Sequence, residues 1–97
     1  MEFDMVIRNG RVVLPGIGLQ EVDLAINGER IAAHLQRGTQ VEAKKILDAG
    51  GKVILPGAID AHNHLGFGDP ETDYRTETRA AALHGVTTLL NFLMSTE

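Results

Sequence analysis

Short apolar runs separated by turn dipeptides dominate the first half of this chain and restrict it to a β-rich start. The dipeptides are Asn9-Gly10, Asn27-Gly28 and Gly50-Gly51. Both residue types adopt positive φ at low cost, and tight turns between antiparallel strands require that backbone conformation. The pattern therefore predicts a meander of hairpins that forms a small β-unit over residues 1–55.

One of the predicted strands has a clear two-residue period. Val22, Leu24 and Ile26 alternate with Asp23 and Ala25, and successive side chains of a strand point to opposite faces of the sheet. We therefore expect this strand to bury one apolar face. Residues 37–45 carry neither a strong period nor a strong turn signal, and they are predicted to be a loop or a frayed strand.

The pattern changes at Pro56-Gly57. An apolar run over residues 58–65 is followed by a polar segment. Thr72 is expected to cap a helix that Gly85 ends, and residues 86–93 form an apolar, β-branched run that is typical of a buried strand. Strand, helix and strand within about 35 residues predict one βαβ unit with parallel strands.

Charge and composition exclude several kinds of partner. The net charge is −4 and the nine lysine and arginine residues form no basic stripe, so nucleic acid is not an expected partner. The sequence shows neither a signal-peptide pattern nor an apolar run long enough for a membrane span, which favours a cytoplasmic protein without a membrane partner. The chain has no cysteine, so any metal ion must be held by histidine, carboxylate or a modified side chain.

His62 and His64 are the strongest candidates for chemistry. In a strand both imidazoles lie on the same face as Asp60, where they can converge on one ion with bonds of about 2.0–2.1 Å to zinc. A His-x-His spacing also arises by chance in a chain with four histidines, so the spacing alone favours an accidental pair. The residues around the pair reverse that preference.

The run LPGAIDAHNHL over residues 55–65 resembles the first barrel strand of the amidohydrolase superfamily. Further blocks resemble the same family in the same order, and they cover residues 9–13, 23–33, 46–53 and 85–88. The resemblance implies a metal-dependent (β/α)8 TIM-barrel hydrolase with a small flanking β-sandwich. It also implies that His62 and His64 bind the more buried ion of a binuclear centre, with zinc as the expected metal. A lysine, two more histidines and an aspartate from later strands complete the site in that family.

The length of the chain limits how much of such a protein is present. A complete barrel needs roughly 250 residues, and the 97 residues here accommodate only its start. We therefore expect an amino-terminal fragment, with residues 1–55 a segment of the β-sandwich and residues 56–97 the truncated start of the catalytic barrel. This fragment alone is expected to be inactive, because the remaining ligands and the general acid/base are absent from it.

Departures from the family pattern indicate which member the chain resembles. Dihydroorotases usually carry an arginine where this chain has Gly66, and dihydroorotases and allantoinases tend to carry Met-Pro where it has Phe92-Leu93. Both differences favour a hydantoinase or dihydropyrimidinase. Such an enzyme hydrolyses the amide bond of a small cyclic ureide, and it is expected to be a homo-oligomer. The alternatives are another amidohydrolase (allantoinase, dihydroorotase, deacetylase or deaminase) and a non-catalytic scaffold relative.

Other polar residues near the predicted site have competing explanations. Asp60 is explained equally well by a role in orienting a metal ligand and by a structural hydrogen bond. Asn91 lies near the end of a barrel strand, where active sites are built, although a hydrogen bond to a neighbouring loop is the preferred explanation. His84, in the last helical turn, and His34 are expected to be structural. The helix dipole explains the acidic residues between positions 69 and 77.

Overall fold

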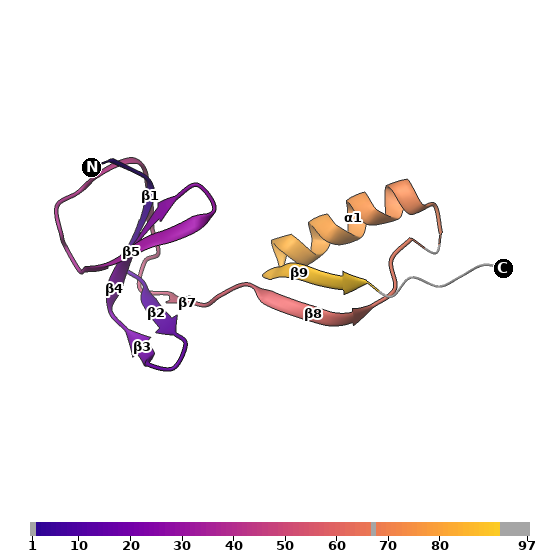
Figure 1. Cartoon of the computed structure of the whole chain (residues 1–97), viewed down its shortest axis with the longest axis horizontal. Helices are drawn as coiled ribbons and strands as arrows, with labels where there is room; N and C mark the ends of the chain where they lie inside the picture. Colours follow the sequence, from indigo (N-terminus) through magenta and orange to yellow (C-terminus); the bar gives the residue numbers. More distant parts are fainter. Residues whose placement is uncertain (1, 67, 92–97) are drawn as a thin grey trace. The chain divides into compact units, whose positions relative to one another are not determined.

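The structure of the chain, a computed structural model, describes residues 2–66 and 68–91. Phe92 and Leu93, on which part of the comparison between family members depends, lie outside the described residues. The chain divides into two compact units, with the boundary between Pro56 and Gly57 (Figure 1). No helix within the described residues is both long and apolar enough to cross a membrane.

The first unit consists of two β-sheets (Figure 1). The larger sheet has the strand order β5-β4-β1-β6, and its strands are β1 (Glu2–Arg8), β4 (Val22–Asn27), β5 (Arg30–Gln36) and β6 (Glu42–Asp48). The smaller sheet has the order β3-β2-β7, and its strands are β2 (Arg11–Leu14), β3 (Gly18–Gln20) and β7 (Val53–Ile54). The prediction of a small β-unit is therefore confirmed.

Only one of the predicted turn dipeptides closes an antiparallel hairpin of the larger sheet. Asn27-Gly28 connects β4 to β5, which pair antiparallel. Asn9-Gly10 and Gly50-Gly51 instead carry the chain from the larger sheet to the smaller one, because β1 pairs with β6 in parallel and β2 pairs with β7 in parallel. The two crossings run side by side, and Ala49 N donates to Arg8 O at 2.8 Å. The predicted meander is wrong, since a local pattern of apolar residues does not report which strands pair.

The strand β6 also differs from the prediction. Residues 37–45, predicted to be a loop or a frayed strand, become regular strand from Glu42 onwards. The partner of β6 is β1, and Glu2 pairs with Glu42 at the start of the ladder. Strand formation here depends on a partner far away in the sequence, so the local pattern does not reveal it.

The second unit contains β8 (Ala58–Asn63), α1 (Pro70–Leu83) and β9 (Val86–Asn91). The strands β8 and β9 pair in parallel, and α1 lies along β9 (Figure 1). The predicted order of strand, helix and parallel strand is confirmed. The predicted burial of the second strand is wrong for the described part of it, because Leu90 is 55% exposed. With a sheet of only two strands, most side chains of β9 keep contact with solvent.

The helix α1 begins earlier than predicted. Its N-cap is Asp69 and Pro70 is the first helical residue, where the fixed φ of proline suits a helix and its missing N–H is not needed. Thr72 therefore lies inside the first turn, and its hydroxyl donates to Oδ2 of Asp69 at 2.6 Å. The predicted end is confirmed, since His84 is the C-cap and Gly85 follows it with a φ of +92°.

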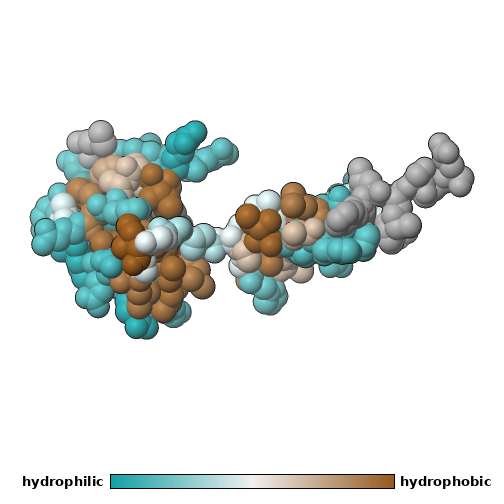
Figure 2. All heavy atoms as spheres, turned by 60° about the horizontal axis from the view of Figure 1, so that its bottom comes forward, coloured by the Kyte–Doolittle hydropathy of each residue, from teal (hydrophilic) through white to brown (hydrophobic). Residues whose placement is uncertain are grey.

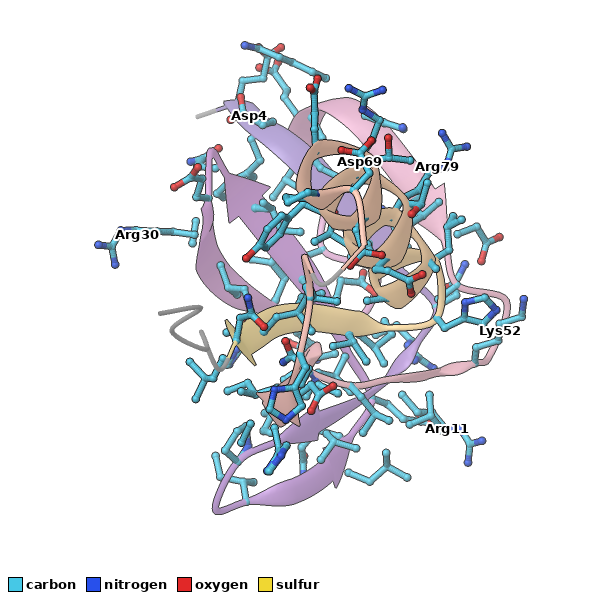
Figure 3. The ribbon with its side chains drawn as sticks, turned by 90° about the vertical axis from the view of Figure 1, so that its right-hand side faces the viewer. Asp4, Arg11, Arg30, Lys52, Asp69 and Arg79 are labelled. Carbon is cyan, nitrogen blue, oxygen red and sulfur yellow. The ribbon has the colours of Figure 1, made fainter. Side chains whose placement is uncertain are left out.

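The surface of the first unit carries apolar side chains as well as charged ones. An apolar pocket of about 290 Å³ opens between the two sheets, and residues of both sheets line it, among them Val12 and Leu24. Figure 2 shows in brown the apolar side chains that reach the surface. The charged side chains of Arg11, Arg30 and Lys52 extend away from the ribbon (Figure 3). This pocket is thus lined mainly by apolar groups of the two sheets.

The strand β4 is buried on both faces, although its sequence predicts one covered face. Ala25 packs with Phe3 and Val6 in the core, and Leu24 is buried on the other side. Asp23 is only 1% exposed. A carboxylate can be buried in this way only when it is paired with a cation and hydrogen-bonded, so its partners decide whether this arrangement is stable.

Asp23 accepts hydrogen bonds from three separate parts of the unit. Its Oδ2 accepts from Nη1 of Arg8 at 3.0 Å and from the main-chain N of Gly38 at 3.2 Å. Its Oδ1 accepts from the main-chain N of Asn9 at 3.3 Å. The same arginine donates through Nη2 to the carbonyl oxygen of Thr39 at 3.0 Å. Asp23 therefore links β4 to the end of β1, to the first crossing and to the segment before β6.

Asp48 stabilises the second crossing in a similar way. Its Oδ1 accepts hydrogen bonds from the main-chain N of Gly50 at 2.8 Å and from Nδ2 of Asn9 at 3.3 Å. The bond from the Gly50 amide and then the bond from Asn9 hold the pKa of Asp48 below the usual value for an aspartate. The ionised carboxylate is thus the form that the folded crossing prefers.

We predict that Asp23→Ala lowers the free energy of unfolding by about 3–5 kcal/mol, since breaking a buried ion pair leaves the charge of Arg8 uncompensated. Urea denaturation followed by circular dichroism measures the change. Glu21→Ala is the control, because it removes an ion pair with Arg37 in which Glu21 is 69% exposed, and such pairs contribute about 0–1 kcal/mol. Equal effects of the two substitutions would show that Asp23 is not essential to the packing.

We also predict that Asp48 makes the fold sensitive to acid. Because the folded-state pKa is the lower one, the contribution of Asp48 is fully present above its unfolded pKa of about 3.9 and is lost as the pH falls through the folded pKa. Asp48→Asn should therefore reduce the loss of stability between about pH 5 and pH 2, as measured by denaturation at a series of pH values. Glu29→Gln, which changes an exposed carboxylate, controls for the lost charge. An acid profile of Asp48→Asn identical to that of the unmodified chain would contradict the prediction.

Candidate metal centre

The two histidines of the motif lie together at the carboxyl end of β8. His62 is in the strand and His64 follows one residue after its end at Asn63. Their Nε2 atoms are 3.2 Å apart, and their ring centroids are 5.1 Å apart with the ring planes inclined at 77°. Both side chains are exposed. The structure therefore brings the two predicted ligands together on one side of the chain.

The separation of the two nitrogens fits a shared ion. Two bonds of about 2.0–2.1 Å that meet at a tetrahedral angle place their nitrogens about 3.3–3.4 Å apart, and the observed Nε2–Nε2 distance is 3.2 Å. The same distance also fits a hydrogen bond in which one imidazole donates and the other accepts. The distance between the two nitrogens thus fits either arrangement.

The described residues contribute two ligands and not a complete set. No group of three or more histidine, cysteine, aspartate or glutamate side chains that could hold a metal ion occurs in residues 2–66 and 68–91. Asp60, which shares the strand parity of the histidines, accepts a hydrogen bond through Oδ1 from the main-chain N of His62 at 3.1 Å. Asp60 therefore contacts the main chain that carries the first ligand.

Asn91 connects the end of β9 to the residue after His64. Its Oδ1 accepts from the main-chain N of Leu65 at 2.8 Å, and its Nδ2 donates to the hydroxyl of Tyr74 at 2.7 Å. Its partner in the β8–β9 ladder is Asn63, whose Nδ2 donates to the carbonyl oxygens of Asp60 at 3.3 Å and Leu90 at 3.2 Å. Asn91 thus makes the contact with a neighbouring loop that was the preferred explanation for it.

Two residues near the histidines were not singled out as site residues by the sequence. Asp73 accepts a hydrogen bond through Oδ2 from the main-chain N of Gly66 at 2.6 Å, although the helix dipole alone was sufficient to explain its position. Tyr74 contacts Asn91 through its hydroxyl. The sequence did contain a signal, because Asp73 and Tyr74 stand near the start of the helix that follows the motif.

The remaining histidines occupy other places. Nδ1 of His84 lies 2.9 Å from the carbonyl oxygen of Ala80, one turn earlier in α1. That contact is the kind of helix-end interaction expected of a structural histidine. His34 is in β5 of the first unit, where it is the ladder partner of Leu24.

The chain is similar to known proteins in both sequence and structure. No protein-family model matches it. An allantoinase of Bacillus licheniformis is 46% identical over 96 residues, which cover 93% of this chain and 20% of the allantoinase. The structure of an L-hydantoinase (dihydropyrimidinase) from Arthrobacter aurescens matches with a TM-score of 0.79 and 32% identity, over 90% of this chain and 20% of that one.

A third match concerns the metal. An N-acyl-D-glutamate deacylase from Bordetella bronchiseptica, solved in complex with zinc and a phosphonate inhibitor, matches with a TM-score of 0.66 and 29% identity, over 92% of this chain and 18% of that one. This chain therefore spans about a fifth of the length of each of these relatives.

The matches agree with one another in both sequence and structure. The fold predicted above, the start of a (β/α)8 barrel hydrolase with a small flanking β-unit, is confirmed by the likeness to the hydantoinase and deacylase structures. Sequence identity to the allantoinase and structural likeness to the hydantoinase both extend over at least nine-tenths of the chain. The chain belongs to the amidohydrolases of the allantoinase and hydantoinase type, and it matches their amino-terminal fifth.

Proposed function

We propose that this chain supplies the first two metal ligands of an enzyme that hydrolyses the ring amide bond of a cyclic ureide. The observation that carries the proposal is the pair of Nε2 atoms of His62 and His64, 3.2 Å apart at the end of β8. We also infer that the first unit is a segment of a β-sandwich and that the second is the start of the catalytic barrel. Activity, substrate and oligomeric state belong to the complete protein that contains these residues.

The proposed substrate class is the five-membered hydantoin ring. Allantoin is itself a hydantoin that carries a ureido group, so the reactions named for the allantoinase and the hydantoinase relatives concern the same ring. The preference for a hydantoinase over an allantoinase depended on Phe92-Leu93 alone, since Gly66 separates the chain only from dihydroorotases. The 46% identity to an allantoinase supports allantoin as strongly as an unsubstituted hydantoin, so both belong in the test.

The residues of this chain have separate tasks in this proposal. His62 and His64 bind a divalent ion, with zinc as the proposed metal, through the neutral form of Nε2. Bound metal lowers the pKa of a water molecule and polarises the scissile carbonyl group. Asp60 holds the main chain at His62. The group that moves protons between water, substrate and leaving nitrogen comes from residues beyond this sequence.

We predict that His62→Ala and His64→Ala, each made in the complete protein, remove bound metal and lower the turnover of allantoin or hydantoin by about 100-fold or more, since loss of contacts outside the ligand shell already costs 10–100-fold. Elemental analysis measures the metal, and circular dichroism checks the fold. His34→Ala, which changes an exposed histidine of β5, should keep both metal and turnover. Folded variants of His62 and His64 with full metal content would refute the assignment.

We further predict that the 97-residue chain alone does not hydrolyse these substrates. Catalytic zinc sites normally use three protein ligands, and a general base must lie within hydrogen-bonding reach of the attacking water, whereas the described residues supply two ligands. The assay is hydrolysis of hydantoin and allantoin by the purified chain with added Zn²⁺. Metal-dependent turnover that His62→Ala abolishes would contradict this prediction.

A further inference from the structure

The main chain that carries His64 is not held by the β-ladder. The strand β8 ends at Asn63, and the register between β8 and β9 shifts between Asp60 and Asn63. His64, Leu65 and Gly66 lie beyond the regular pairing. Other contacts must therefore fix the position of the second ligand.

Asn91 replaces the missing ladder partner at Leu65. Its Oδ1 accepts from the main-chain N of Leu65 at 2.8 Å, and its Nδ2 reaches the carbonyl oxygen of Leu65 at 3.5 Å. One amide side chain thus engages both main-chain polar groups of the residue next to His64. A neighbouring strand would make the same pair of contacts.

The first turn of α1 holds the following residue. Oδ2 of Asp73 accepts from the main-chain N of Gly66 at 2.6 Å. Gly66 has a φ of +88°, and a Cβ at this position would lie 2.9 Å from Cε2 of Tyr74. Glycine adopts this backbone conformation easily. The ring of Tyr74 lies against the side of Gly66 where a Cβ would stand. Its hydroxyl accepts from Nδ2 of Asn91 at 2.7 Å, which joins the contacts from α1 and β9 into one network.

We propose that Asp73, Tyr74 and Asn91, called here the turn clamp, are positioning residues of the metal centre. They hold the main chain of Leu65 and Gly66 so that Nε2 of His64 stays beside Nε2 of His62. The metal centre is thus built by β8, α1 and β9 together, and not by the strand that carries the ligands alone. This inference rests on the proposed metal-binding function.

The test compares two substitutions of one residue. Asp73→Ala and Asp73→Asn both remove a charge from the first turn of α1, but only asparagine keeps an oxygen that can accept from Gly66. We expect Asp73→Ala to weaken Zn²⁺ binding by about 10-fold, within the range for contacts outside the ligand shell, and Asp73→Asn to recover most of that loss. Asn91→Ala should weaken binding at least as much as Asp73→Ala. Arg75→Ala, which breaks an exposed ion pair with Glu71 on the same helix, should leave it unchanged.

The measurement is a Zn²⁺ titration of the 97-residue chain, followed through the imidazole NMR signals of His62 and His64. Backbone amide spectra show that each variant is folded, and if Asn91→Ala unfolds, the two Asp73 variants decide. Affinities of Asp73→Ala and Asp73→Asn within twofold of each other would overturn the turn clamp. Zn²⁺ binding that survives His62→Ala would instead show that the proposed metal site is wrong, so the two failures are distinguishable.

Discussion

The buried carboxylate of Asp23 is the interaction on which the first unit depends. It lies in β4 and accepts hydrogen bonds from the end of β1, from the first crossing between the sheets and from the segment before β6. Each of these segments has to be in place before the charge is compensated, because a buried charge without partners is strongly unfavourable. One side chain thus couples the larger sheet to the turn that leads into the smaller one.

The sequence contained enough information to predict the elements but not their pairing. Short apolar runs and the turn at Asn27-Gly28 predicted strands and one hairpin correctly. The parallel pairing of β1 with β6 depends on contacts between distant segments, so the meander predicted from local turns was wrong. The burial of Asp23 escaped prediction for a related reason. An acidic residue in an alternating strand is normally placed on the solvent face. The exception is explained by the positions in space of Arg8 and of the main-chain amides of Asn9 and Gly38.

At the candidate site, too, the sequence predicted the local arrangement but not the contacts with distant segments. Strand parity predicted that His62 and His64 share a face, and their Nε2 atoms lie within 3.2 Å of each other. The contacts that hold the segment after His64 come from α1 and β9, which lie outside the motif in the sequence. The predicted start of α1 was wrong for a local reason. Asp69 and Thr72 are both possible capping residues, and Asp69 is the N-cap because the fixed φ of Pro70 suits the first helical position.

The central position of β1 in its sheet has a consequence during synthesis. β1 is made before both of its neighbours in the sheet, β4 and β6. The pairing of Glu2 with Glu42 spans a length of chain that takes roughly 2–8 s to make at about 5–20 residues per second. Throughout that interval one edge of β1 has no strand beside it, and such an edge can pair with other nascent chains. The first unit can therefore be completed only after β6 and β7 have been made, however fast its hairpins form.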